Sequence, residues 1–246
     1  MKIISQLENY LSGSKNHMSN YGMRHLYNAN YNSITNEMQS GFFDELTYYK
    51  KVKSFFYNLL IKKIFGKDIN NNFFIKSYKK LCKEQHRLFD ISLIIHSIVF
   101  KMLQNYNLLN EKICTIGDGK ANFVSGCLFL KENPIKIYSV NLPQALIQDY
   151  IIINKFNLIE DKLIKVVNTE EDLLDKNIKL FLIPVKNKFF LKKKNINLFV
   201  NMASFQEMPV KETNDYFDII KSNKAFLYCL NREEKTMYDG TTFRYK

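Results

Sequence analysis

The stretch Glu111-Lys-Ile-Cys-Thr-Ile-Gly-Asp-Gly-Lys-Ala-Asn-Phe-Val-Ser-Gly126 decides the fold. In it, a short apolar run over residues 113–116 leads into Gly117-x-Gly119, and a helical pattern begins near Asn122. Gly117 allows a tight turn, and Gly119 leaves the backbone open to a ligand because it has no Cβ. The helix that follows offers N–H groups at its first turn. We predict a strand, a ligand-binding turn and a helix; a purely structural turn is the alternative.

Four further apolar runs follow this stretch, and helical patterns separate most of them. The runs cover residues 135–140, 178–183, 196–200 and 225–230. The clearest helical patterns cover residues 144–156 and 210–222. Short buried strands that alternate with helices are typical of a parallel sheet in an α/β fold. Residues 86–246 are therefore predicted to form one Rossmann-like domain.

The chain before this domain has a different pattern. Apolar residues recur at helical intervals over residues 48–65, and Gly66 is placed to end that helix. Residues 1–85 are therefore predicted to form an all-helical N-terminal region. A polar and aromatic stretch that includes His17 and His25 suggests a lid on the acceptor side of a binding site.

Asn141 ends the second apolar run, about 22 residues after Gly119. In dinucleotide and S-adenosylmethionine sites, this position carries an acid that binds the ribose hydroxyls. Asn141 has no charge, but its amide can still donate and accept hydrogen bonds. The alternative is that Asn141 caps the helix that begins near Pro143, and the two roles are compatible.

The formal net charge is +12, a balance that suits nucleic acid, membrane surfaces or anionic substrates. The lysines are spread along the chain, and four arginines are few for a protein that reads bases. We therefore expect a solvated basic surface and no nucleic-acid partner.

The four cysteines form no C-x-x-C pair, so the spacing of a zinc site is absent from the sequence. No apolar run approaches the roughly 20 residues that span a bilayer, and the first residues do not resemble a signal peptide. The sequence therefore predicts a cytoplasmic protein with no membrane span. Asp215 and Asp218 share a helical pattern, but they are expected to lie on a solvated face, and we predict no metal.

Five segments together resemble the bacterial sugar O-methyltransferases, a group of class I S-adenosylmethionine-dependent enzymes. They are His86-Arg-Leu-Phe-Asp-Ile, Ile116-Gly-Asp-Gly, Asn141-Leu-Pro, Asn201-Met-Ala-Ser-Phe-Gln-Glu-Met208-Pro and Tyr228-Cys-Leu-Asn-Arg-Glu-Glu234. The resemblance covers about residues 80–246. It implies a class I methyltransferase sheet, S-adenosylmethionine as the cofactor, and a sugar or glycan precursor as the acceptor. The cofactor-binding residues that it implies are Thr115, Gly117, Asp118, Gly119, Asn141, Leu142 and Ser204.

Methyl transfer to a hydroxyl requires a group that removes the hydroxyl proton. Glu207 is the predicted base because it lies just past the run 196–200, at the edge where ligands bind in such sheets. Its alternative role is to cap the helix that starts near Pro209. His86 is the second catalytic candidate. The predicted contacts to the acceptor are Gln206, Asn231 and Arg232.

Two family positions that usually carry acids hold Thr115 and Asn141 here. A class I methyltransferase sheet also gains two more strands after the position of residues 225–230. Three interpretations stay open: the domain is incomplete, a partner completes it, or the N-terminal half supplies compensating structure. These departures favour one alternative, a catalytically silent binding protein of the same fold. The +12 charge suggests another, a nucleic-acid methyltransferase. Association into a homo-oligomer stays open.

Overall fold

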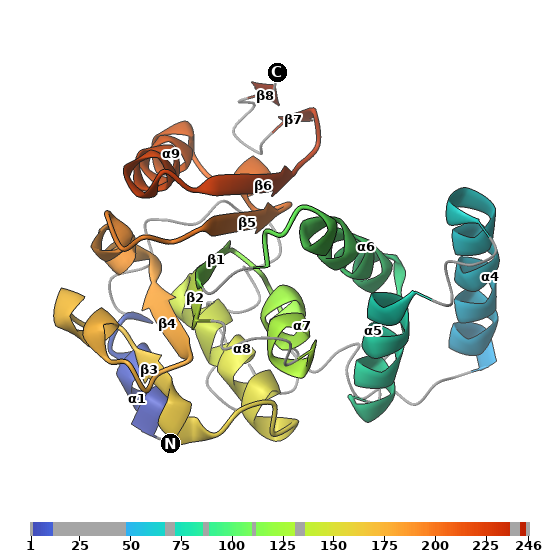
Figure 1. Cartoon of the computed structure of the whole chain (residues 1–246), viewed down its shortest axis with the longest axis horizontal. Helices are drawn as coiled ribbons and strands as arrows, with labels where there is room; N and C mark the ends of the chain where they lie inside the picture. Colours follow the sequence, from blue (N-terminus) through green and yellow to red (C-terminus); the bar gives the residue numbers. More distant parts are fainter. Residues whose placement is uncertain are drawn as a thin grey trace.

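The protein is built on a six-stranded sheet in which every neighbouring pair of strands is parallel (Figure 1). The computed structural model describes residues 2–11, 48–66, 72–85, 89–109, 112–130, 136–236 and 242–244. The strand order is β3-β4-β2-β1-β5-β6. The strands are β1 (Lys112–Ile116), β2 (Lys136–Asn141), β3 (Ile164–Val166), β4 (Leu180–Pro184), β5 (Leu198–Met202) and β6 (Phe226–Leu230). The predicted α/β fold with a parallel, Rossmann-like sheet is confirmed.

All five predicted strands are present, and β3 is an additional one. The central strands β1, β2, β4 and β5 are buried almost throughout, which explains their near-continuous apolar sequences. Strand β3 has only three residues and pairs with β4. Strand β6 is the opposite edge, and Phe226 and Leu230 on it are exposed.

Helices cover one face of the sheet. They are α1 (Lys2–Glu8), α5 (Phe73–Glu84), α6 (Ile91–Asn105), α7 (Asn122–Leu130) and α8 (Pro143–Lys155). Their apolar side chains form one core with alternate strand residues such as Ile113 and Ile137. Within it, the rings of Phe100 on α6 and Phe123 on α7 stack with centroids 4.5 Å apart. Helix α4 (Tyr48–Phe65) adds Ile61 to the same core.

The second face is covered by short 3₁₀ helices and by one long helix. They are η4 (Glu170–Leu174), η5 (Val185–Leu191) and α9 (Val210–Asn223). Two further 3₁₀ helices lie in connections, η3 (Asp161–Leu163) and η6 (Phe205–Glu207). On this face the rings of Tyr138 and Phe181, on the neighbouring strands β2 and β4, stack at 5.1 Å. The sheet is therefore the middle of three layers.

The start of the chain packs on the sheet domain. Helix α1 contacts α8 and β3 (Figure 1). Just after it, the Tyr10 hydroxyl donates to Asn168 Oδ1 at 2.7 Å and accepts from Asn187 Nδ2 at 3.1 Å. The described parts of residues 1–85 hold helices α1, α4 and α5, and the division of the chain near residue 85 stays a prediction. His17 and His25, the residues of the lid hypothesis, lie outside the described residues.

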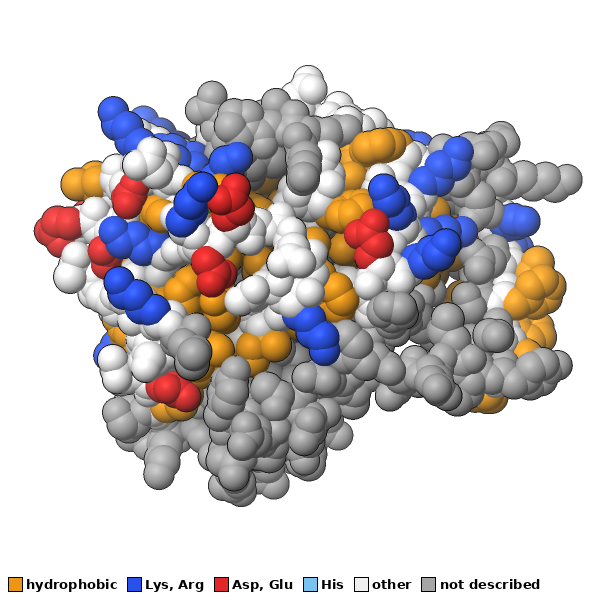
Figure 2. Space-filling view, turned by 90° about the horizontal axis from the view of Figure 1, so that it is seen from below, with side chains coloured by type: hydrophobic (Ala, Val, Ile, Leu, Met, Phe, Trp, Pro, Cys, Tyr) orange, Lys and Arg blue, Asp and Glu red, His pale blue; other side chains and the backbone are white. Residues whose placement is uncertain are grey.

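After β6 the chain forms a separate two-stranded antiparallel sheet of β7 (Glu234–Thr236) and β8 (Thr242–Arg244). These strands do not extend the parallel sheet, so β6 remains its edge in the described part of the chain. Across the described residues, every helix is too short or too polar to cross a membrane. On the face shown in Figure 2, basic side chains lie among acidic and apolar ones rather than in one continuous patch.

Candidate functional site

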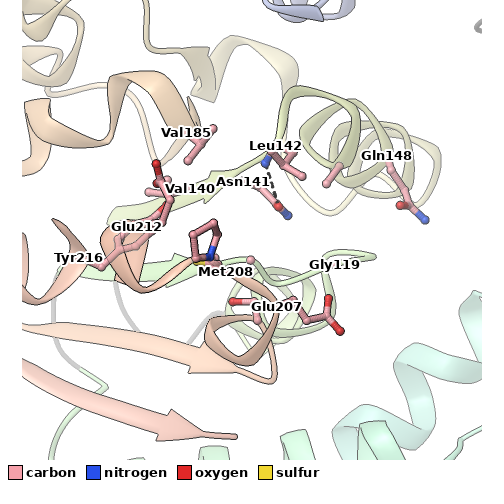
Figure 3. A pocket seen from close by; sticks show the side chains of 14 residues that line it. Gly119, Val140, Asn141, Leu142, Gln148, Val185, Glu207, Met208, Glu212 and Tyr216 are labelled. Carbon is pink, nitrogen blue, oxygen red and sulfur yellow. Dashed lines mark hydrogen bonds between the residues drawn. The ribbon is translucent and has the colours of Figure 1, made fainter. Parts of the chain in front are cut away.

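A cavity of about 180 Å³ lies at the carboxyl ends of β1 and β2 (Figure 3). The chain runs from β1 to β2 on one side, while β5 lies on the other side of β1, so the cavity is at a switch point of the strand order. Ligands of open α/β sheets bind at such points. The cavity is lined by Gly117, Gly119, Val140, Asn141, Leu142, Ala145, Gln148, Val185, Ser204, Glu207, Met208, Pro209, Glu212 and Tyr216.

The glycine turn forms one wall of this cavity. Gly117 has a φ of +68°, and its N–H donates to Val140 O at 2.9 Å, which ties the turn to the end of β2. A Cβ on Gly117 would overlap Ser204, whereas a Cβ on Gly119, with φ +40°, would point into open space. Lys120 and Ala121 continue the turn with φ of 64° and 49°, a conformation that costs non-glycine residues about 1–2 kcal/mol each. Strain of this kind concentrates at functional sites.

Asp118, predicted to bind the cofactor, points its carboxylate into the start of α7 instead. Its two oxygens accept the N–H groups of Phe123 and Val124, each at 2.8 Å. Asp118 Oδ1 also lies 3.9 Å from Nε2 of the buried His96. The helix N–H groups that the sequence offered to a ligand are therefore bound by the protein's own carboxylate. Asp118 supports the turn from outside the cavity.

We expect Asp118→Ala to lower the free energy of unfolding by about 2 kcal/mol, because two N–H groups at the start of α7 lose their acceptor. Urea denaturation measures this change. Asp118→Asn keeps one acceptor oxygen and is expected to lose less. An alanine variant as stable as the parent would contradict the capping role.

A hydrogen-bonded network ties the ends of β1, β5 and β6 together. Asn201, at the end of β5, donates to Ile116 O at 3.1 Å and to Ser204 Oγ, and Ser204 Oγ donates to Ile116 O at 2.8 Å. Asn231 Nδ2, after β6, donates to Asn201 Oδ1 at 3.0 Å.

The predicted acceptor contacts belong to the same network. The Gln206 N–H donates to Asn231 Oδ1 at 3.2 Å, and Gln206 Oε1 accepts the N–H of Arg232 at 3.0 Å. The Arg232 side chain is exposed. Gln206, Asn231 and Arg232 therefore hold two loops together and do not line the cavity. These polar residues belong to the segments that carried the family resemblance, and their contacts in the structure explain them as residues that hold loops together.

Two carboxylates line the cavity: Glu207 from η6 lies near Gly119, and Glu212 from α9 lies near Tyr216 (Figure 3). Glu212 is held by Lys188, which also pairs with Asp215 Oδ2 at 3.0 Å and lies over the ring of Tyr216, 5.4 Å from its centroid. Lys188 itself is 4% exposed and does not line the cavity. The N-cap of α9 is Pro209, not Glu207.

Asn141 lines the cavity from the end of β2. Its Oδ1 accepts the Leu142 N–H at 2.9 Å, while its Nδ2 is buried and completes no hydrogen bond among the described residues. The N-cap of α8 is Leu142, so the alternative that Asn141 caps this helix is wrong. Behind Asn141 lies Asp149 of α8, a fully buried carboxyl group that the sequence analysis did not single out.

The structure brings together six of the predicted site residues and separates the others. The six that line the cavity are Gly117, Gly119, Asn141, Leu142, Ser204 and Glu207. Thr115 is buried within β1, and His86 lies outside the described residues. Sequence reasoning missed Gln148, Glu212 and Tyr216, whose only signal is their place on the helices that follow β2 and β5. Among the residues that can be described, no three His, Cys, Asp or Glu side chains cluster as metal ligands.

The sheet topology and the position of the cavity define a Rossmann-like α/β protein with a candidate ligand site at the carboxyl edge of its strands. No model of a known protein family matches the chain, and no curated protein matches it.

Proposed function

We propose that the chain is an S-adenosylmethionine-dependent O-methyltransferase that acts on a hydroxyl of a sugar or glycan precursor. The observation that carries this proposal is that a glycine turn, the end of β2 and a carboxylate all line one cavity. Gly117, Gly119 and Asn141 line it on the side of β1 and β2, and Glu207 lines it from the loop after β5.

The charge of the cavity supports S-adenosylmethionine over a dinucleotide. Its lining residues, all within the described part of the chain, include two carboxylates and no lysine, arginine or histidine. Such a lining suits a ligand with a sulfonium and an ammonium group, and it disfavours a pyrophosphate. The open space beside Gly119 and the unsatisfied Asn141 Nδ2 supply room and a polar contact.

The residues of the chain have distinct roles in the proposed reaction. S-adenosylmethionine, when bound, supplies an electrophilic methyl group. The glycine turn and Asn141 would hold the cofactor, with the Asn141 amide available to its ribose hydroxyls. Glu207 accepts the proton of the acceptor hydroxyl, a role that requires only its carboxylate within the cavity. The apolar lining, with Val140, Val185 and Met208, excludes water from the reacting groups.

Calorimetric titration with S-adenosylhomocysteine tests this proposal. We expect the parent chain to bind and Gly119→Val to abolish binding, because the valine side chain would enter the cavity and disfavour the φ of +40°. The matched control is Gly66→Val, which has a φ of +88° and open space but lies at the end of α4, away from the lining residues. It is expected to leave the affinity unchanged. No binding by the parent chain would contradict the proposal and select a catalytically silent protein of this fold.

A further inference from the structure

We propose that Asp149 is a positioning residue of this site, which holds the glycine turn from behind and supplies the negative charge that the neutral Asn141 lacks. The part that concerns the ligand rests on the function proposed above. The part that concerns the turn does not, because it involves only contacts within the chain.

Asp149 binds the strained part of the turn directly. Its side chain is 0% exposed, and Oδ1 accepts the Ala121 N–H at 2.7 Å across 28 positions of sequence. Ala121 is the last of three consecutive residues with positive φ, after Gly119 and Lys120. A backbone in this conformation persists only where its surroundings stabilise it. The bond from Asp149 fixes the turn to α8, as the bonds from Asp118 fix it to α7.

The other carboxylate oxygen, Oδ2, is buried and belongs to a side chain that lies near Asn141. Neither Asp149 Oδ2 nor Asn141 Nδ2 completes a hydrogen bond within the described residues, and both atoms are buried. The two side chains are nevertheless close enough for the Asn141 amide to lower the pKa of Asp149. A small rotation of Asn141 would join them and satisfy both atoms. Buried polar atoms without partners are unfavourable, so a bond between these two atoms would stabilise both side chains.

Such a bond would make Asn141 a better acceptor. With Nδ2 donating to Asp149, Asn141 Oδ1 would bind the Leu142 N–H through one lone pair and keep the other for a ligand hydroxyl. The carboxylate behind the amide would polarise it, because hydrogen bonds in a chain strengthen one another. Asn141 and Asp149 together would then accept hydrogen bonds from ligand hydroxyls as a single acidic residue does at the end of β2.

The charge state of Asp149 decides how strongly this arrangement acts. Burial raises the pKa of the Asp149 carboxyl to about 7, against the lowering effect of the hydrogen bond from the Ala121 N–H and of the nearby Asn141 amide. Asp149 therefore changes from mostly neutral to mostly charged between about pH 6 and pH 8. The other titratable side chains on the turn and on α6, α7 and α8 are Asp118, Lys120, His96, Lys101, Cys127, Tyr150 and Lys155. From α5, the Tyr78 hydroxyl donates to Asn122 O at the start of α7, at 3.1 Å.

The same shift makes the stability of the fold depend on pH. The folded pKa of about 7 lies above the ordinary value of 3.8, so between these values the folded state holds a proton that the unfolded state has lost. The contribution of Asp149 to the free energy of unfolding is therefore largest below about pH 4 and is lost as the pH rises through 7. We expect Asp149→Asn to remove this slope.

Two measurements test the proposal. Both are made on three proteins: the parent chain, Asp149→Asn and Asp161→Asn. Asp161 is the matched control, because it lies beyond α8 and its carboxylate accepts from the Tyr150 hydroxyl, at 3.0 Å, rather than from the turn. In ¹⁵N NMR spectra, we expect the Ala121 amide to titrate with a midpoint near pH 7 in the parent and in Asp161→Asn, but not in Asp149→Asn. In the second measurement, the affinity of the parent for S-adenosylhomocysteine is expected to rise about tenfold from pH 6 to pH 8, since the charged fraction of Asp149 rises by that factor. Asp149→Asn should show no such rise.

The outcomes separate this inference from the proposed function. If the Ala121 amide titrates identically in the parent and in Asp149→Asn, the claim that Asp149 stabilises the glycine turn is overturned, whether or not a ligand binds. A parent that binds S-adenosylhomocysteine with the same pH profile as Asp149→Asn would overturn the role toward Asn141 and leave the proposed function intact. If the parent does not bind S-adenosylhomocysteine, the proposed function is overturned, and so is the role of Asp149 toward the ligand. The NMR result would still decide whether Asp149 stabilises the turn.

Discussion

Replacing Lys188 with methionine is expected to lower the free energy of unfolding by about 3 kcal/mol. Lys188 is 4% exposed, and its ammonium group pairs with Glu212 and with Asp215. Methionine would fill most of the volume but leave two carboxylates facing each other without a cation. Breaking a buried ion pair on one side costs more than the pair contributes, because the remaining charge stays desolvated. Urea denaturation at neutral pH measures the loss.

Two controls separate this effect from the loss of a lysine in general. Lys186→Met removes a lysine from the same 3₁₀ helix, where it is exposed and lies over the Tyr10 ring at 4.0 Å, and is expected to cost under about 1 kcal/mol. Adding Glu212→Gln and Asp215→Asn to Lys188→Met removes the unpaired charges and should restore much of the stability. Equal effects of Lys188→Met and Lys186→Met would show that the ion pairs of Lys188 contribute little.

Gly117→Ala is expected to cost about 3 kcal/mol and to abolish binding of S-adenosylhomocysteine. The φ of +68° disfavours alanine by about 1–2 kcal/mol, and the new Cβ would overlap Cβ and Oγ of Ser204. Relief of this overlap would move either the turn or the loop after β5, and both line the cavity. Urea denaturation and calorimetry measure the two effects.

The contact with Ser204 gives this prediction an internal check. Ser204→Gly removes the overlapping atoms, so Gly117→Ala with Ser204→Gly is expected to be more stable than the sum of the two single changes predicts. Recovery would be partial, because the φ penalty remains and Ser204 Oγ no longer binds Ile116 O. Additive losses in the double variant would mean that the overlap is not the source of the cost.

The sequence predicted the sheet well because its central strands are buried on both faces and therefore have continuous apolar sequences. Strand β3 was missed for the opposite reason: it has three residues, its middle residue Lys165 is charged, and its position beside β4 depends on pairing. The 3₁₀ helices η4 and η5, which cover the second face, were also not predicted, since such short turns carry no amphipathic period.

Six of the fourteen residues that line the cavity were predicted from the sequence, because residues at the ends of neighbouring parallel strands meet at one edge. This rule brought Gly117, Asn141 and Glu207 to one cavity. It could not tell which way a side chain turns, and the carboxylate of Asp118 binds α7 instead of facing the cavity. Asp149 was overlooked although it is an acid in a largely apolar helical pattern, because only the fold shows that its helix lies behind the turn.

The packing of α1 also bears on how the protein is made. Translation delivers this helix before Asn168 and Asn187, which lie 158 and 177 positions beyond Tyr10 and bind its hydroxyl. Contacts so distant along a chain form slowly and late. On the ribosome, Ile3 and Leu7 therefore stay without the partners that bury them until most of the sheet has emerged. These two side chains therefore stay exposed in the nascent chain until α8 and β3, which α1 contacts, have been synthesised, so the docking of α1 is a late step of folding.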